Sequence, residues 1–273
     1  MARKTHNRRL NDLDGKDWVK STKSWFVINP RPRPRERLDH PAKFPEELVK
    51  RLTRFFTKPG DWVLDPFAGT GSTQRACSDI SRNCVGIELN PAFVEQTEAV
   101  SGDVQIHTIV GDSRDARSLL EHYFDGDIPE LQYIITSPPY FDMLRKSRGG
   151  NESTHKQRET AGLKQYYSDD EADLGNITEY DQYLEAIGEI FDGLHPLLAD
   201  RAYLTVVAQN MRDVDGTLRP IAWDLARRLS QRYELRQEMI WCQDNKRLGC
   251  WGYPSTYVSN VHHHYCLVLQ RES

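Results

Sequence analysis

From residue 60 onward, short apolar runs alternate with helical stretches, and this alternation constrains the fold more than any other feature of the chain. Such an alternation predicts parallel strands joined by crossover helices, and hence an α/β fold. We expect strands at residues 62–67, 84–89, 105–110, 132–136, 203–208, 234–241 and 264–269. Helical patterns fall at residues 73–80, 92–100, 178–198 and 220–232. Residues 141–177 and 242–261 lack either periodicity and are candidate inserts.

The N-terminal part of the 273-residue chain differs from the rest in charge. Residues 1–58 hold 16 Lys and Arg against 7 Asp and Glu, whereas the remainder holds 20 against 33. Residues 1–24 are polar and expected to be loose, 25–28 resemble a strand, and PRPRPRER at 30–37 favours an extended strip. A helix is expected at 45–57, with Glu46 and Glu47 in its first turn. We therefore expect a basic arm, residues 1–37, before one domain at 38–273.

Charge and composition bound the function. A positive end on an acidic body suggests a polyanionic partner, although a solvated tail without a partner stays open. A mean hydropathy of −0.68 and the lack of an eighteen-residue apolar run argue against a membrane protein. The first residues, MARKTHNRRL, contain no apolar segment of a secretory signal. Five scattered cysteines, an odd number, indicate packing residues in a reducing cytoplasm rather than a disulfide scaffold.

A glycine-rich loop, DPFAGTGST at 65–73, follows the first of these strands and precedes a helix. A phosphate-binding Walker loop would need a lysine that is missing, and a dinucleotide fingerprint would need a third glycine where Gln74 stands. A loop for S-adenosylmethionine remains, and so does a tight turn without a ligand. Glu88, at the end of the next strand, supports a nucleoside ligand because a carboxylate there can accept both ribose hydroxyls.

The segment TSPPY, residues 136–140, ends the fourth of these strands. Two consecutive prolines remove two N–H donors and fix φ twice, so the strand stops and backbone carbonyls project from a rigid turn beside Tyr140. In an open α/β sheet, ligands bind at this carboxyl edge. Rigid acceptors beside an aromatic ring suit a planar base carrying an amino group; a plain strand-ending turn is the alternative.

The chain resembles the amino-group DNA methyltransferases, which make N4-methylcytosine or N6-methyladenine with S-adenosylmethionine. The resemblance lies in HPAKFPEELVKRL (40–52), GDWVLDPFAGTGST (60–73), VGIELNPAFVE (85–95), VGDSRD (110–115), TSPPY (136–140) and VHHHYCLVLQ (261–270). It implies a doubly wound, mostly parallel, seven-stranded methyltransferase sheet with an antiparallel last strand and small inserts. The inserts at 141–177 and 242–261 would then recognise the target.

The resemblance also implies site residues. Those expected to bind the cofactor, with Glu88 on the ribose and Asp112 facing the adenine amine, are Lys43, Asp65, Phe67, Gly69, Gly71, Ser72, Thr73, Glu88, Leu89, Asp112 and Ser113. The catalytic residues would be Ser137, Pro138, Pro139 and Tyr140. The expected reaction is direct methyl transfer to an exocyclic nitrogen, with Tyr140 stacked on a flipped base and no metal required.

The base and the substrate class follow from smaller signals. Ser137, in place of Asp or Asn, resembles the N4-cytosine members more than the N6-adenine members. No cysteine follows a proline, which argues against methylation of cytosine carbon 5. An RNA or protein-glutamine substrate, and a binding module without catalysis, stay open as alternatives to a DNA methyltransferase of a restriction-modification system.

Double-stranded DNA is the expected partner, and its contacts fall on the arm and the inserts. The candidate residues are Arg31, Arg33, Arg35, Arg145, Lys146, Arg148, Lys246 and Arg247. Trp251 and Tyr253 add aromatic rings suited to base contact. A zinc site from Cys242, Cys250 and the histidines at 262–264 matches no standard ligand spacing and is not expected.

Overall fold

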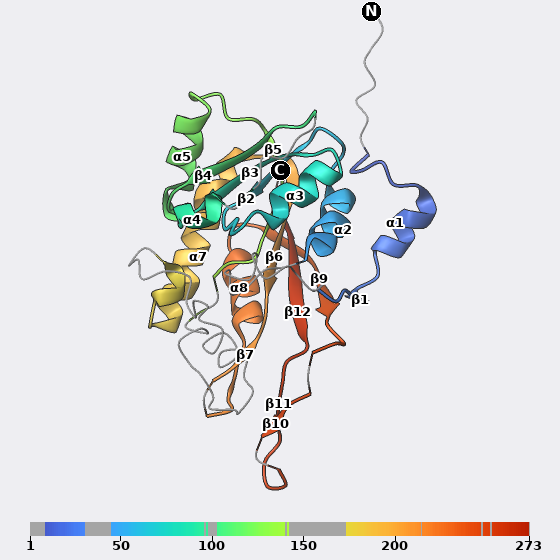
Figure 1. The fold of residues 1–273 in the computed structure, drawn as a ribbon, viewed down its shortest axis with the longest axis vertical. Helices are drawn as coiled ribbons and strands as arrows, with labels where there is room; N and C mark the ends of the chain where they lie inside the picture. The colour runs from blue at the N-terminus through green and yellow to red at the C-terminus, as the bar shows by residue number, and fades with distance from the viewer. Residues whose placement is uncertain are drawn as a thin grey trace, which may run out of the picture.

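The computed structural model describes residues 9–30, 45–95, 97, 103–139, 141, 173–213, 215–246, 248–251 and 253–272. Within them, the centre is an eight-stranded sheet in the order β1-β9-β12-β6-β5-β2-β3-β4 (Figure 1). Its strands are β1 (Trp25–Val27), β2 (Trp62–Asp65), β3 (Asn83–Glu88), β4 (Ile106–Val110), β5 (Leu131–Thr136), β6 (Leu198–Ala208), β9 (Glu234–Cys242) and β12 (His263–Gln270).

All neighbouring pairs in this sheet are parallel except those of β12, which runs antiparallel to β6 and β9. The chain builds outward from β2 to β3 and β4, and then restarts on the other side of β2 with β5. The prediction of a doubly wound, mostly parallel sheet with an antiparallel last strand is therefore confirmed. An eighth strand is added, because β1 pairs parallel with β9 at the edge.

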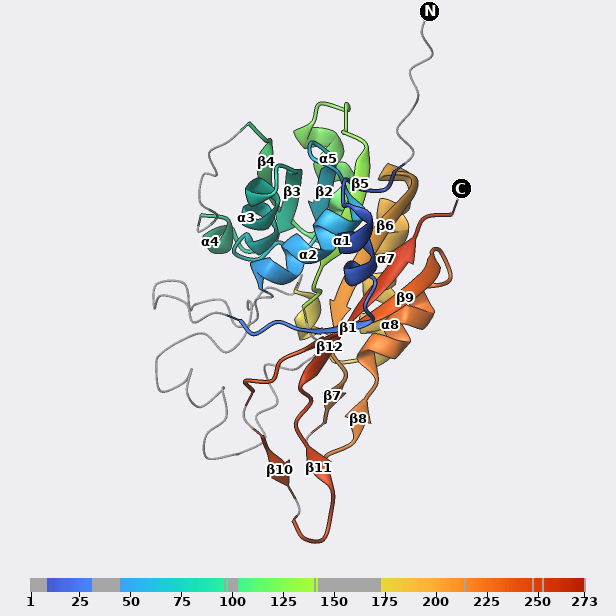
Figure 2. The same ribbon diagram turned by 90° about the vertical axis from the view of Figure 1, so that its right-hand side faces the viewer.

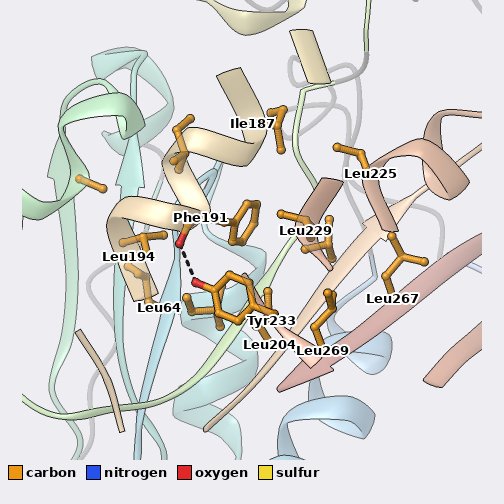
Figure 3. Close-up of a cluster of buried hydrophobic side chains, with 14 of the residues drawn as sticks. Leu64, Ile187, Phe191, Leu194, Leu204, Leu225, Leu229, Tyr233, Leu267 and Leu269 are labelled. Atoms are coloured by element: carbon orange, nitrogen blue, oxygen red, sulfur yellow. Dashed lines mark hydrogen bonds between the residues drawn. The ribbon is translucent and has the colours of Figure 1, made fainter. Parts of the chain in front are cut away.

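Helices cover both faces of the sheet because strand residues alternate between them. Val63 on β2 packs into a cluster with helices α2 (Glu46–Phe56) and α3 (Ser72–Asp79). Leu64, the next residue, packs on the other face with α5 (Ala116–Tyr123), α7 (Tyr180–Leu194) and α8 (Ile221–Leu229). Figures 1 and 2 show the helices around the sheet, and Figure 3 shows Leu64 beside Phe191 and Leu194 of α7.

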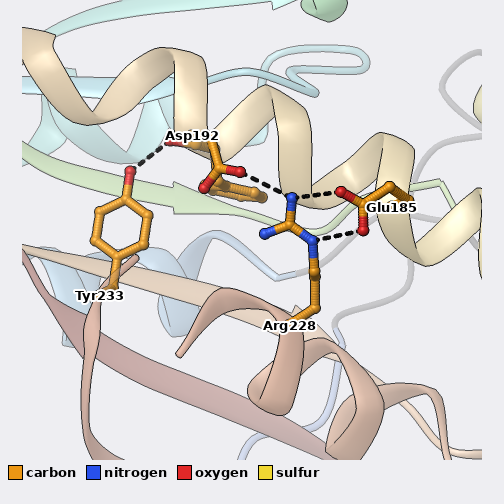
Figure 4. A network of polar contacts seen from close by, with 5 residues as sticks. Glu185, Asp192, Arg228 and Tyr233 are labelled. Atoms are coloured by element: carbon orange, nitrogen blue, oxygen red, sulfur yellow. Dashed lines mark hydrogen bonds and ion pairs between the residues drawn. The ribbon is translucent and has the colours of Figure 1, made fainter. Parts of the chain in front are cut away.

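Helices α7 and α8 are joined by an ion-pair network (Figure 4). The Arg228 Nη2 atom lies 2.8 Å from both Glu185 and Asp192. Residue 188 must be small for this arrangement, since a Cβ at Gly188 would lie 2.3 Å from the guanidinium carbon of Arg228. Beside the network, Tyr233 donates its hydroxyl to the carbonyl of Phe191 at 2.6 Å (Figures 3 and 4). These contacts fix α7 against α8 and against Tyr233, which precedes β9.

Two sequence-based expectations were wrong or incomplete. Residues 9–24 are not loose: α1 (Gly15–Ser21) begins at an Asp14 cap, and the Trp18 ring lies 5.0 Å from that of Phe55. The polar composition concealed this helix because a single aromatic residue anchors it. Helix α5 was also not predicted, since it offers the core only Ala116 and Leu120 as buried residues.

The remaining elements are short. Helix α4 (Pro91–Val94) covers only the start of the helix expected at 92–100, where residues 96 and 98–100 lie outside the described part. The 3-10 helices are η2 (Ser113–Asp115), η3 (Leu174–Asn176) and η4 (His195–Leu197).

Two hairpins, β7 (Met211–Arg212) with β8 (Leu218–Arg219) and β10 (Cys250–Trp251) with β11 (Val258–Ser259), extend from the sheet. Across the described ranges, none of the helices combines the length and apolarity needed to cross a membrane.

Candidate active site

The candidate site lies at the carboxyl edge of the sheet. Because all strands but β12 are parallel, the segments after β2, β3, β4 and β5 leave the sheet at this one edge. These segments carry the predicted glycine loop, Glu88, Asp112 and the Ser-Pro-Pro turn. Strands β2 and β5 are neighbours at the point where the direction of chain progress reverses, which is where open α/β sheets bind ligands.

The glycine loop adopts a backbone that requires glycine. Gly69 and Gly71 have φ angles of +54° and +82°, and Gly71 caps the start of α3. A Cβ at Gly71 would lie 2.8 Å from the Cγ2 atom of Thr97. Ser72 and Thr73, also predicted to bind the cofactor, form the buried first turn of α3, while Phe67 is half-buried. The N–H groups of a first helical turn have no partner within the helix and suit a ligand acceptor.

Asp65 braces this loop from inside. Its side chain is fully buried and accepts hydrogen bonds from the Phe67 N–H at 3.0 Å, the Thr73 hydroxyl and, at 2.6 Å, the Thr136 hydroxyl. Burial raises the pKa of Asp65 to about 6, against the opposing effect of these donors. The carboxylate thereby ties the glycine loop to the end of β5. Direct contact with a cofactor stays a prediction for this residue.

The helix following the loop packs closely on β3 because residue 86 is glycine. A Cβ there would lie 2.1 Å from Nε2 of Gln74 and 2.7 Å from Cβ of Ala68. Gln74 occupies the position of the third glycine of a dinucleotide fingerprint, and it fits because β3 offers no side chain opposite it. Its Nε2 atom donates to Thr108 on β4 at 3.2 Å.

Glu88, the last residue of β3, connects the end of this strand to the glycine loop. Its two carboxylate oxygens accept the N–H groups of Gly69 and Asn90, each at 2.8 Å. Burial raises the pKa of Glu88 to about 7. A carboxylate can accept about four hydrogen bonds, so two acceptor positions remain after these two donors. That number matches the two hydroxyls of a ribose. Leu89 follows and is half-buried.

The exit of β4 is held against the same loop. Ser113 is buried and donates its hydroxyl to the carbonyl of Pro66. Asp112 caps η2 by accepting the Arg114 N–H at 2.9 Å, and it also pairs with the Arg114 guanidinium. The structure therefore brings together the exits of β2, β3 and β4. Lys43, the remaining predicted cofactor residue, lies outside the described residues.

The Ser-Pro-Pro turn follows Thr136 directly, with Pro138 buried and Ser137 and Pro139 half-buried. Tyr140 lies outside the described residues. Sequence reasoning missed a contact to this turn: the buried Tyr183 on α7 donates its hydroxyl to the carbonyl of Pro139 at 2.9 Å. The two residues are 44 positions apart, and only the fold reveals the pair.

Most of the predicted DNA-binding residues lie outside the described part of the chain; these are Arg31, Arg33, Arg35, Arg145, Lys146, Arg148 and Arg247. Lys246 is half-buried, and burial lowers its pKa. The two segments that carry the arm and the second insert nevertheless leave the sheet together. Asn29, after β1, donates to the Asp244 carboxylate at 2.6 Å, and the Asp244 N–H donates back at 3.2 Å.

The second insert ends in the β10–β11 hairpin, which extends beyond the body of the molecule (Figures 1 and 2). Its connecting segment exposes Tyr253 and Tyr257, at 87% and 81%. The histidines at its base have packing partners: His264 is buried and stacks on Trp241 with ring centroids 4.4 Å apart. Among the residues that the structure describes, no three His, Cys, Asp or Glu side chains gather as a metal site.

Comparison with known proteins agrees with this geometry. A family model described as DNA methylase matches residues 3–99. The type II methyltransferase M.BglI of Bacillus subtilis is 39% identical over 87 residues, which cover 31% of this chain and 24% of that protein. M.BglII of Bacillus subtilis is 29% identical over 139 residues, covering 49% of this chain and 37% of that protein. The chain thus spans well under half the length of these relatives.

Among solved structures, TrmN from Thermus thermophilus superposes over 83% of this chain and 48% of its own, with a TM-score of 0.46 and 17% identity. The fold class rests instead on the strand order described above. The N-terminal third of the chain is thus similar to the DNA methylase family. The family implies S-adenosylmethionine as cofactor. The residues present fit it, because Glu88 retains acceptors for a ribose and Gly69 and Gly71 place no side chain between the loop backbone and a ligand.

Proposed function

We propose that this chain is a DNA methyltransferase that methylates the exocyclic amino group of a flipped base, within a restriction-modification system. The observation that carries the proposal is the junction of β2 and β5. The glycine loop and the Ser-Pro-Pro turn follow neighbouring parallel strands, and Asp65 accepts the Thr136 hydroxyl between them. A cofactor loop and an acceptor turn thereby share one edge of the sheet.

The loop residues would hold S-adenosylmethionine, which supplies a methyl group activated by a sulfonium. Glu88 would accept the ribose hydroxyls, while Gly69 and Gly71 let the backbone approach the ligand closely. The first turn of α3 offers N–H groups that suit a carboxylate. Asp112 and Ser113 would border the adenine, with Ser113 fixed by its bond to Pro66.

The turn residues would make the target amine reactive. An aromatic amine is a weak nucleophile because its lone pair is delocalised into the ring. The Ser137 hydroxyl and the Pro138 carbonyl would accept hydrogen bonds from its two N–H groups, so that the lone pair would localise on nitrogen. The nitrogen would take the methyl group as the methyl–sulfur bond of the sulfonium breaks, and one N–H proton would leave to water. Tyr140 would stack on the flipped base, and such stacking contributes about 1–3 kcal/mol per base.

Cytosine N4 is the base position that we favour over adenine N6. The support is Ser137 in the turn, which resembles the N4-cytosine members of the family. Positioning should supply much of the acceleration, since the methyl group is already a good electrophile.

The DNA would lie along the arm and the second insert. This placement of the DNA is supported by the hydrogen bonds between Asn29, after β1, and Asp244, after β9. Through them the segments that lead to the arm and to the second insert leave the sheet side by side. The exposed Tyr253 and Tyr257 of the hairpin suit contact with a nucleic acid, because aromatic rings stack on bases. Phosphate contacts by the arm would make binding salt-dependent.

The substrate class can be tested by tritium transfer. The full chain is mixed with labelled S-adenosylmethionine and, in parallel, with unmethylated plasmid DNA, total tRNA or a protein extract. Label in DNA alone supports the proposal, and a Ser137→Ala variant should then lose most of it. Label in tRNA or protein alone would overturn the DNA assignment.

A further inference from the structure

Tyr183 holds the backbone of the Ser-Pro-Pro turn at a defined point. Its hydroxyl donates to the Pro139 carbonyl at 2.9 Å, and its side chain is 1% exposed. The proline rings already fix φ at residues 138 and 139. The free torsion at Pro139 is ψ, which sets the direction of its carbonyl and of the peptide leading to residue 140. A buried hydrogen bond to that carbonyl therefore fixes the remaining torsion.

A second anchor lies on the far side of residue 140. Phe141 is buried, and its ring centroid lies 5.4 Å from those of both Tyr180 and Tyr183. The Arg219 guanidinium lies 5.3 Å from the Phe141 ring and 4.8 Å from the Tyr180 ring. Arg219 lies on β8 and pairs with Asp213 at 2.7 Å, so the β7–β8 hairpin contacts this aromatic group through one side chain held by an ion pair. Both chain neighbours of residue 140 are thus attached to the same surface of α7.

We propose that Tyr183 is a positioning residue, which orients the Pro139–Tyr140 peptide for the reaction by its hydrogen bond to the Pro139 carbonyl. This inference rests on the proposed function, because the turn matters for catalysis only if it binds the target amine. Tyr183 contacts the backbone of the turn, and it acts by setting where the turn presents its acceptors. Small displacements of reacting groups cost up to about 100-fold in rate.

The chain provides a matched control for this bond. Tyr233 is equally buried and also donates its hydroxyl to a backbone carbonyl of α7, that of Phe191 at 2.6 Å (Figure 3). Tyr183→Phe and Tyr233→Phe each keep the ring and its packing while removing one buried Tyr-to-carbonyl hydrogen bond. The Tyr233 bond faces α8 and the Arg228 network (Figure 4), not the turn.

The experiment measures both variants in the full chain. We expect Tyr183→Phe to lower kcat for DNA methylation about tenfold or more, with the Kd for S-adenosylmethionine within twofold, whereas Tyr233→Phe should keep the parent kcat. In hydrogen exchange, the peptide spanning residues 131–141 should exchange faster only in Tyr183→Phe. Equal kcat values for the two variants, or unchanged exchange in that peptide, would overturn the proposal.

The hydrogen-exchange measurement distinguishes a failure of this inference from a failure of the proposed function. If the parent chain methylates no DNA, the proposed function fails, and the exchange comparison still decides whether Tyr183 orders the turn. If the parent is active and both readouts of Tyr183→Phe match the parent, only the positioning role fails.

Discussion

Thr136, the last residue of β5, donates its hydroxyl across 2.6 Å to the carboxylate of Asp65, the last residue of β2. The bond joins the two strand ends from which the glycine loop and the Ser-Pro-Pro turn depart. Because Asp65 is fully buried, it depends on such donors when it is ionised. The glycine loop and the Ser-Pro-Pro turn are therefore held together where they leave the sheet.

Replacing Thr136 by valine tests this junction. Thr136→Val keeps the shape of the side chain but removes a donor to a buried carboxylate, so we expect the free energy of unfolding to fall by about 1.5–3 kcal/mol at pH 8. The loss should be smaller at pH 5, because the pKa of Asp65 is about 6 and a protonated carboxyl needs the donor less. Urea denaturation at both pH values measures the effect.

The control for this prediction is Thr53→Val. Thr53 is equally buried on α2, and its hydroxyl has no hydrogen-bond partner among the described residues. The control should therefore lose little stability at either pH. A loss for Thr136→Val that equals that of the control would show that the junction contributes nothing.

Glu88 gives a pH-dependent prediction for cofactor binding. Its pKa is raised to about 7, and hydroxyl donors of a ribose would favour its ionised form. Binding should therefore weaken as the pH falls below about 7, since the carboxyl must then lose a proton to accept both hydroxyls. Glu88→Gln should raise the Kd for S-adenosylmethionine about tenfold and flatten its pH profile, as measured by calorimetry. Glu121→Gln, on the exposed surface of α5, should change neither; a parental profile in Glu88→Gln would refute the ribose role.

Gly86→Ala should disturb the glycine loop and α3, because both pack against β3 at this residue. The new Cβ would meet the amide of Gln74 and the Cβ of Ala68 at distances that real structures do not show. We expect a destabilisation of about 1–3 kcal/mol in thermal or urea unfolding, together with weaker cofactor binding. Gly193→Ala on α7 is the matched control, because a Cβ there meets nothing within 4 Å and alanine favours a helix. Tolerance of Gly86→Ala without any shift would contradict the close packing of α3 on β3.

The hairpin gives a prediction about DNA affinity. Tyr253→Ala combined with Tyr257→Ala should weaken binding of a duplex about tenfold. The Kd for S-adenosylmethionine should not change, since both rings are exposed on the β10–β11 segment, which lies apart from α3 and the glycine loop before it (Figures 1 and 2). Fluorescence anisotropy with a labelled duplex measures this. Tyr123→Ala, an exposed aromatic of α5 beside His107 of β4, should have no effect. If the double variant binds DNA like the parent, the hairpin is not a contact surface.

The sheet could be predicted because its signals are local. The ends of β2 and β5 carry apolar runs, and a glycine or proline stands at the start of α3, α4 and α8, namely Gly71, Pro91 and Pro220. The loop and Glu88 were recognisable for the same reason, since a strand, two glycines and an acid follow one another closely in the chain. The pairing of β1 with β9 was not predictable, because the paired residues, such as Trp25 and Ile240, lie 215 positions apart and no pattern links them.

The contacts that order the site are the ones that the sequence hides. Asp65 and Thr136 are 71 positions apart, and Tyr183 meets Pro139 only because α7 packs over the end of β5. Gly86 carried a usable signal, since a glycine within a strand marks a close approach of another segment. Its partner Gln74, however, could be identified only in the folded chain.

The identity of the methylated nucleoside tests the central claim most directly. Plasmid DNA treated with the full chain and S-adenosylmethionine is digested to nucleosides and separated by liquid chromatography with mass detection. The account predicts N4-methyldeoxycytidine. N6-methyldeoxyadenosine would contradict the choice of base, and DNA without any methylated exocyclic amine would contradict the account as a whole.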